Sequence, residues 1–329
     1  MKYKSFLFFI LSCLPLSLVL AQGPNNSGTY YSNADGLKGK ELKTSLATII
    51  VNPTNVGYGG LYEAYKKTDT RPDGYVRDWY SNTTNYTHGV DNKGNYQKEG
   101  DMYNREHVVP QSWFGSGDIK SDVVHVLPTD GYVNNRRGNN PFGEVNNVTY
   151  QSSNGYSKLG SCKTPGYSGT VFEPNDEIKG DIARIFFYMI TRYEGSCASW
   201  GHDVFTSEYP GLTTWTLDMM MRWSKQDPVD EVELQRNSAV FEVQGNRNPY
   251  VDYPGLEEYT WGEWMEVPFS YANYESEPTD ISSLPASPKG EETIYNLAGQ
   301  RISRSSETSV PSVLPKGVYI INGRKVLVK

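Results

Sequence analysis

The chain has 329 residues, of which 37% are hydrophobic and 21% are charged, and its net charge at pH 7 is −7. This composition is ordinary for a soluble globular protein, and the length is enough for two domains. The acidic balance excludes a broad basic groove for duplex nucleic acid, since phosphate contacts normally come from clustered lysine and arginine. Any nucleic-acid site must therefore be local.

The N-terminus has the pattern of a secretory signal peptide. Lys2 and Lys4 precede an apolar run over residues 6–21 that ends in a small residue. We expect residues 1–21 to be removed on export, and the loss of the two lysines takes the net charge from −7 to −9. A membrane anchor is the alternative, but Pro15 interrupts a run that is too short for a stable membrane span.

Two cysteines remain after the signal peptide, Cys162 and Cys197. We predict a disulfide between them, because exported proteins fold in compartments where disulfides persist. It would close a loop of about 35 residues and stabilise the folded state by about 3 to 4 kcal/mol in the chain-entropy model. A zinc site is the rival interpretation, but the two residues lack the close spacing of zinc ligands.

The first predicted element is an amphipathic helix. Leu37, Leu42 and Leu46 recur at near-helical spacing between residues 30 and 50. Residues 51–104 are rich in Gly, Asn, Thr and Tyr, which predicts turns.

The residues best suited to chemistry gather at 103–144. We predict a strand that ends near Pro110, a second strand at about 123–127, and a short helix that begins at Thr129 or Asp130, both good N-caps. Glycine and asparagine are frequent in that helix although they are weak helix formers. Broken local propensity points to a functional site.

Three more helices follow, at 176–193, 214–224 and 230–243. The loop after them carries Arg247, which could line an active site or simply be solvated. The fold class is therefore α+β, with a helix-rich body around a small two-stranded element.

The tail differs in composition. Residues 270–292 are rich in Ser, Pro, Glu and Asp, which indicates a linker. Residues 293–329 are strand-like, and Asn322-Gly323 is a strong signal for a hairpin turn. A small all-β module at the C-terminus is expected.

The motif Arg105-Glu106-His107, with Val-Val-Pro behind it, and the Asn-Asn-Arg-Arg run at 134–137 resemble the endonuclease I family. The similarity extends from about residue 28 to about residue 259, so residues 22–269 are assigned to one nuclease domain. Flanking pieces also fit, including ADGLKGKELK and QGNRNPYVDYP. The resemblance implies a secreted or periplasmic non-specific nuclease with a His-Me finger, also called the ββα-metal motif.

The resemblance implies that His107 is the general base and that Glu106 and Asn134 hold one Mg²⁺, which Mn²⁺ or Ca²⁺ could replace. The chemistry agrees, because a neutral imidazole accepts a proton at pH 7 and Mg²⁺ prefers oxygen ligands. Geometry adds a condition. Neighbours in a regular strand point to opposite faces, so Glu106 and His107 share one site only where the strand ends or bulges.

Four arginines are predicted to contact phosphate or nucleic acid: Arg105, Arg136, Arg137 and Arg247. Arg137 coincides with the arginine of the family's Asn-x-x-Arg pattern. We expect His125 to be a structural support on the buried second strand. Many family members have a His-His pair there, whereas this chain has Val124-His125.

These patterns, with the resemblance, predict an exported, metal-dependent endonuclease that cleaves DNA, with RNA as a second substrate. The resemblance implies that cleavage leaves 5′-phosphate ends. The tail resembles the C-terminal sorting domain of the type IX secretion system, which implies the secretion machinery as a partner. The product would be secreted or held at the cell surface, with the periplasm as the alternative. A non-catalytic surface adhesin and a degenerate nuclease are the rival hypotheses, and a zinc peptidase is disfavoured because no His-Glu-x-x-His motif occurs.

Overall fold

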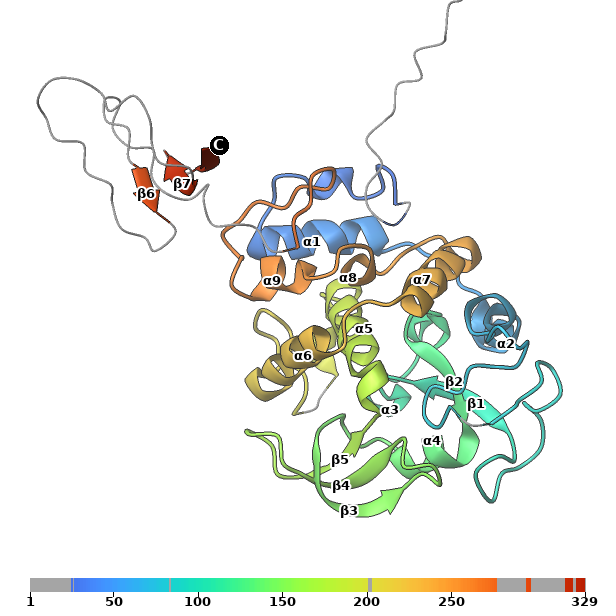
Figure 1. The fold of residues 1–329 in the computed structure, drawn as a ribbon. Helices are drawn as coiled ribbons and strands as arrows, with labels where there is room; N and C mark the ends of the chain where they lie inside the picture. Colours follow the sequence, from blue (N-terminus) through green and yellow to red (C-terminus); the bar gives the residue numbers. More distant parts are fainter. Residues whose placement is uncertain are drawn as a thin grey trace, which may run out of the picture. The chain divides into compact units, whose positions relative to one another are not determined.

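The computed structural model describes residues 25, 27–82, 84–200 and 203–276, and the backbone of strands at 294–296, 317–321 and 324–328. The chain divides into two compact units, residues 1–276 and 277–329 (Figure 1). The predicted signal peptide and most of the predicted linker lie outside the described residues.

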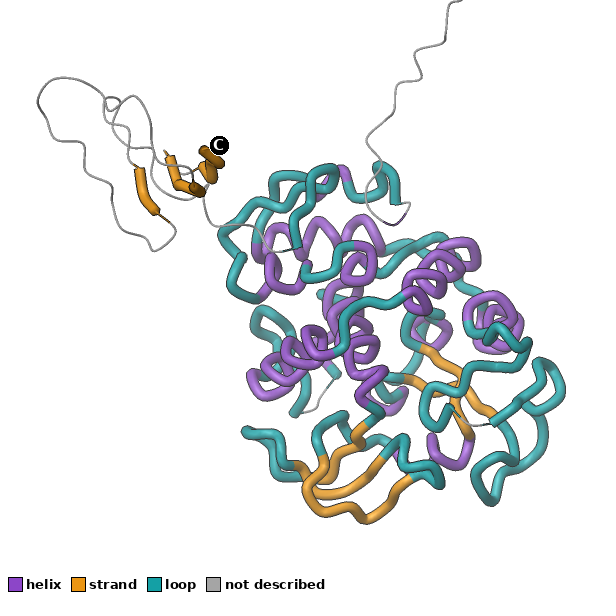
Figure 2. The backbone as a smooth tube through the Cα atoms, in the orientation of Figure 1, coloured by secondary structure: helices purple, strands orange, loops and turns teal. Residues whose placement is uncertain are grey.

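The first unit has the predicted α+β character. Its helices are α1 (Gly39–Ile50), α2 (Gly57–Thr68), α3 (Gln111–Phe114), α4 (Gly131–Arg137), α5 (Lys179–Arg192), α6 (Thr214–Gln226), α7 (Glu231–Gln244), α8 (Pro249–Asp252) and α9 (Leu256–Trp261). Its strands are β1 (Tyr103–His107), β2 (Val126–Asp130), β3 (Val145–Gln151), β4 (Lys158–Cys162) and β5 (Thr170–Glu173). Figure 2 shows the β1–β2 pair apart from the β3–β4–β5 sheet.

The core is built around α5, which runs through the middle of the unit (Figure 1). All 14 residues of α5 are buried, and the helix packs against α1, α6 and α8. α1 contributes the predicted apolar face through Leu42, Leu46 and Ile50. Four of the predicted helices are therefore confirmed by α1, α5, α6 and α7. α1, α5 and α6 carry an apolar stripe at helical spacing, whereas the buried face of α7 is mostly polar, with Glu233, Arg236 and Asn237 among its buried residues.

Helix α2 was not predicted, and residues 51–104 were expected to form turns. Gly57, Gly59 and Gly60 in its first turn are poor helix formers. The helix forms because Leu61 and Tyr65 are buried and the element packs against α7. Tertiary packing here overrides local propensity.

The three-stranded antiparallel sheet β3–β4–β5 was also missed. Its register shifts between Val145 and Val148 and again before Tyr150, so the alternation that marks a strand is broken. At Gly160 a Cβ would lie 2.0 Å from the Asn147 carbonyl oxygen, so the close approach of β4 to β3 requires glycine.

The second unit contains β6 (Ile294–Asn296), β7 (Gly317–Ile321) and β8 (Arg324–Val328) in one antiparallel sheet, ordered β6–β7–β8. The predicted hairpin pairing is confirmed, because Ile321 pairs with Arg324. The expected turn residues, Asn322 and Gly323, lie outside the described residues.

The predicted disulfide is wrong for this structure, since Cys162 and Cys197 are free thiols. Cys162 ends β4 and its Sγ accepts from the Thr164 amide at 3.2 Å, while Cys197 is buried after α5. A pair of cysteines in a sequence gives no distance between them. Among the described residues, no helix combines the length and the apolar character needed to cross a bilayer.

Candidate active site

A ββα unit formed by β1, β2 and α4 organises the site. β1 and β2 pair antiparallel from Tyr103 with Asp130 to His107 with Val126. The Asp130 carboxylate caps α4 by accepting from the amides of Tyr132 (2.8 Å) and Val133 (3.0 Å). The predicted helix start is correct, whereas β2 begins three residues later than expected because residues 122–125 form a turn.

Glu106 and His107 point to opposite sides of β1. The pairing with β2 stays in register through both residues, and the strand ends at His107. Glu106 meets Tyr80 and Arg137, whereas His107 meets Tyr58 and the loop before β2. The side-chain alternation of a regular strand is thus kept up to its last residue, without a bulge, so the two side chains could serve one site only around the end of the strand.

Glu106 is 3% exposed, and both of its protein partners bind the same oxygen. Oε1 accepts hydrogen bonds from the Tyr80 hydroxyl (2.8 Å) and from Nη1 of Arg137. Oε2 accepts none from the described residues. Burial raises the pKa of Glu106, and the charge of Arg137 and the Tyr80 hydroxyl oppose the shift. One oxygen is therefore fixed while the other is open to a ligand.

Arg137 lies inside the protein, 1% exposed, with each guanidinium nitrogen bonded to the protein. Besides Glu106, its acceptors are the carbonyls of His107 (2.8 Å), Val108 (2.8 Å) and Asn140 (3.2 Å). These bonds tie α4 to the end of β1. The predicted phosphate contact would require Arg137 to leave this network.

Asn134 lies on α4 three residues before Arg137, so both face the same side of the helix. α4 packs against β1 on that side. Asn134 is half-buried, and its side-chain amide makes no hydrogen bond with the described residues. The arrangement brings an uncommitted amide toward the side of β1 that carries Glu106.

His107 is 8% exposed and its ring orientation is set by a backbone carbonyl. Nε2 lies 3.1 Å from the Lys120 carbonyl oxygen, which can only accept a hydrogen bond. This contact assigns the proton to Nε2 and leaves Nδ1 as a proton acceptor. Burial, with His125 next, lowers the pKa of His107 to about 3, so the ring is neutral at pH 7.

His125 is fully buried in the turn before β2, not on the strand itself. Its Nε2 lies 2.7 Å from the Ile119 carbonyl, and its ring centroid is 5.6 Å from that of His107. Burial lowers the pKa of His125 to about 4, although Asp122 opposes the shift. His125 thus packs as a neutral ring against His107.

The other three arginines occupy different surroundings. Arg105 is half-buried on the same side of β1 as His107. Arg136 is exposed and stacks over Tyr132 at 4.9 Å. Arg247 is buried in an ion pair with Asp252, and none of its described contacts reaches the ββα unit. The structure therefore does not bring Arg247 to the site.

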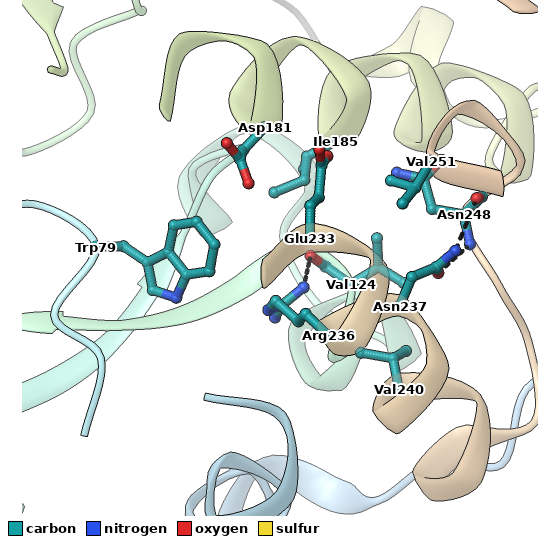
Figure 3. A pocket seen from close by; sticks show the side chains of 10 residues that line it. All are labelled: Trp79, Val124, Asp181, Ile185, Glu233, Arg236, Asn237, Val240, Asn248 and Val251. Atoms are coloured by element: carbon teal, nitrogen blue, oxygen red, sulfur yellow. Dashed lines mark hydrogen bonds between the residues drawn. The ribbon is translucent and has the colours of Figure 1, made fainter. Parts of the chain in front are cut away.

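Several supporting residues escaped the sequence reasoning. Arg236 on α7 donates to the carbonyls of Val123 (2.7 Å) and Val124 (3.2 Å), which fixes the turn that holds His125. Figure 3 shows Arg236 beside Val124, in the lining of a small pocket that also includes Trp79. The contacts of Arg236 leave no sequence signal, because they join segments that are far apart in the chain. The Lys120 carbonyl leaves none either, because a backbone oxygen is present at every residue.

The available donors fit a hard cation. Among the described residues no three His, Cys, Asp or Glu side chains converge as a metal cluster. Glu106 Oε2 and the Asn134 amide oxygen offer two oxygen donors, too few and too hard for structural zinc. Mg²⁺ often takes only one or two protein ligands and completes its shell with water and phosphate oxygens. The donor set is therefore suitable for Mg²⁺.

Comparison with known proteins relates this chain to nucleases. Residues 38–255 match the family model described as Endonuclease I. A protein of Bacillus subtilis (strain 168) named "Extracellular ribonuclease" is 35% identical over 256 residues, which cover 75% of this chain and 83% of the relative. The "Extracellular ribonuclease" of Bacillus amyloliquefaciens is 34% identical, over 71% of this chain and 78% of the relative. An "Extracellular deoxyribonuclease" of Aeromonas hydrophila is 26% identical, over 45% of this chain and 64% of the relative.

Proposed function

Because the chain belongs to the endonuclease I family and is a hydrolase that acts on nucleic acids, we propose that it is an exported, Mg²⁺-dependent endonuclease with His107 as general base. Glu106 and Asn134 would hold the metal, and cleavage would leave 5′-phosphate ends. The observation that supports this best is the contact from His107 Nε2 to the Lys120 carbonyl, since it leaves Nδ1 able to accept a proton.

In the proposed reaction, Nδ1 of His107 takes a proton from the water that attacks phosphorus. A pKa of about 3 keeps the imidazole in its proton-accepting form, but it also makes the ring a weak base. Transfer therefore depends on stabilisation of the developing charge on the phosphate oxygens. Mg²⁺, when bound, would neutralise phosphate charge and assist the leaving oxygen.

Arg137 and Tyr80 have a positioning role in this proposal. They hold Oε1 of Glu106, so Oε2 and the Asn134 amide oxygen remain for the cation. Arg137 also donates to the His107 carbonyl, which links the metal-binding side of β1 to the residue that carries the base. We propose Arg105 and Arg136, rather than Arg137, as the contacts to substrate, because both retain solvent exposure.

RNA is the substrate we favour, and DNA is the second candidate. The two relatives named ribonucleases match more of this chain, at higher identity, than the deoxyribonuclease of Aeromonas hydrophila. Their names also place them outside the cell, in agreement with a signal peptide at 1–21. We further propose that residues 22–269 are the nuclease domain and that residues 293–329 are read by a secretion system.

The test uses the mature chain, residues 22–329, with ribosomal RNA and plasmid DNA in Mg²⁺ or EDTA. We expect cleavage only with Mg²⁺, its loss in His107→Ala, and in Asn134→Ala a loss at low Mg²⁺ that higher Mg²⁺ restores. His88→Ala is the matched control, since His88 bonds Thr70 and has no part in the site. If the wild-type chain leaves both substrates intact in Mg²⁺, Mn²⁺ and Ca²⁺, the enzyme proposal fails and a binding role such as an adhesin replaces it.

A further inference from the structure

Arg105 is held between two tyrosine rings of α2. Its guanidinium carbon lies 3.6 Å from the ring centroid of Tyr58 and 4.5 Å from that of Tyr62. Tyr58 and Tyr62 are one helical turn apart, so their rings face the same way. We call Tyr58, Arg105 and Tyr62 the tyrosine clamp. Cation–π contact with both rings restricts the orientation of the guanidinium.

The cation in the clamp has no carboxylate partner among the described residues. Nη1 donates to the Tyr58 carbonyl at 2.8 Å, and Nε is buried without an acceptor. Nη2 is not among the buried unpartnered atoms of the described residues. The Tyr62 hydroxyl interacts with the cation, which opposes the rise that burial causes in the pKa of Tyr62. A fixed, unpaired cation remains.

The clamp lies directly beside the proposed base. Arg105 and His107 are two residues apart on one face of β1, which is about 7 Å along a strand. Tyr58 joins them, because its ring also stacks against His107 with centroids 6.0 Å apart and planes at 16°. A substrate whose scissile phosphate meets His107 therefore brings a neighbouring phosphate within reach of Arg105.

We propose that the tyrosine clamp is a binding subsite for the phosphate that neighbours the scissile one. This inference rests on the proposed nuclease function and adds the length of substrate that the site recognises. The two rings hold the guanidinium ready, so little side-chain entropy is lost when phosphate binds. Guanidinium is suited to phosphate because it donates from a planar, rigid group.

The test compares a decaribonucleotide with a dinucleoside monophosphate, which has the scissile phosphate and no neighbour. For Arg105→Lys, which keeps the charge and loses the planar donor, we expect KM for the decamer to rise about tenfold with kcat within about twofold. The dinucleotide, which has no neighbouring phosphate, should lose much less of its kcat/KM than the decamer. Tyr62→Leu, which removes one wall, should raise KM for the decamer by a smaller factor.

Arg71→Lys is the matched control, because Arg71 also stacks on a tyrosine, Tyr75 at 5.7 Å, but is paired with Asp73. Unchanged KM for the decamer in Arg105→Lys, or equal losses on both substrates, would overturn the subsite. Binding of a labelled decamer in EDTA is measured in parallel. Weaker binding by both Arg105→Lys and Tyr62→Leu supports the clamp even without turnover, and equal binding refutes it, whereas an inactive wild-type chain refutes only the nuclease proposal.

Discussion

The buried ion pair between Arg137 and Glu106 joins α4 to β1, and the same nitrogen of Arg137 also binds the His107 carbonyl. One guanidinium thus fixes the carboxylate proposed for the metal and the backbone of the residue proposed as the base. Both side chains are at most 3% exposed. If one partner were removed, little water could therefore reach the remaining charge to stabilise it. This relationship gives Arg137 a role in stability that a surface phosphate contact would not have.

Replacing Arg137 with methionine should lower the free energy of unfolding by about 3 to 5 kcal/mol, because the Glu106 carboxylate would be left buried without its partner. Urea unfolding at pH 7 measures the loss. Arg136→Met, at the exposed neighbour, is the control and should change stability by about 0.5 kcal/mol or less. If Arg137→Met folds as stably as the wild type, the pair does not anchor α4.

Asn134→Ala should separate activity from stability. The amide makes no hydrogen bond with the described residues, so its removal should change the free energy of unfolding by less than about 0.5 kcal/mol. Loss of a metal ligand should shift the Mg²⁺ concentration for half-maximal activity upward by about tenfold or more. Asn135→Ala, at the next and exposed position, should leave both quantities unchanged. An unaltered Mg²⁺ dependence in Asn134→Ala would remove this residue from the proposed metal site.

The two cysteines provide a test of the corrected disulfide prediction. Burial raises the pKa of Cys197, whereas Cys162 is half-buried at the end of β4. A thiol reagent at pH 8 should therefore modify Cys162 first and reach Cys197 only after denaturation. Dithiothreitol should leave the melting temperature of the mature chain unchanged. A fall in melting temperature with reductant would show that a disulfide forms in the exported protein.

The parts of the fold that the sequence predicts are those set by local chemistry. Asp130 caps α4 with its own side chain, and α5 displays apolar residues at every helical turn, so both elements can be recognised from neighbouring residues alone. α2 could not be recognised because its glycines oppose a helix and its stability comes from packing against α7. Local signals therefore determine most of the long helices.

The site divides in the same way. Glu106, His107 and Asn134 were proposed from a motif, which needs only the order of residues. The partner of Arg137 and the tautomer of His107 depend on contacts to residues 31 and 13 positions away, and the second contact uses a backbone oxygen that no residue type reveals. Tyr58 stacks on His107 from α2, an element that was itself unpredicted. The family was therefore more predictable than the geometry of the proposed site.

The two buried histidines predict how stability depends on pH. Folding lowers the pKa of His107 to about 3 and that of His125 to about 4, mainly through burial, from about 6.5 in the unfolded chain. Between pH 6 and pH 4.5 the unfolded state binds protons that the folded state does not. The free energy of unfolding should therefore fall with decreasing pH, by about 1.4 kcal/mol per pH unit for each histidine.

Urea unfolding at intervals from pH 7.5 to pH 4.5 measures this slope. His107→Gln should remove about half of this slope, because glutamine does not titrate. His88→Gln should leave most of the slope: the pKa of His88 is also lowered, but this side chain is partly exposed, whereas His107 and His125 are buried. Asp122 contributes to the pH dependence of stability at lower pH. Burial favours its neutral form, but Arg192 and His125 hold its pKa below the usual value. Its contribution to the free energy of unfolding is therefore lost only in stronger acid. A flat profile between pH 6 and pH 4.5 would mean that His107 and His125 accept protons in the folded state. The assignment of both rings as neutral in the folded protein would then be wrong.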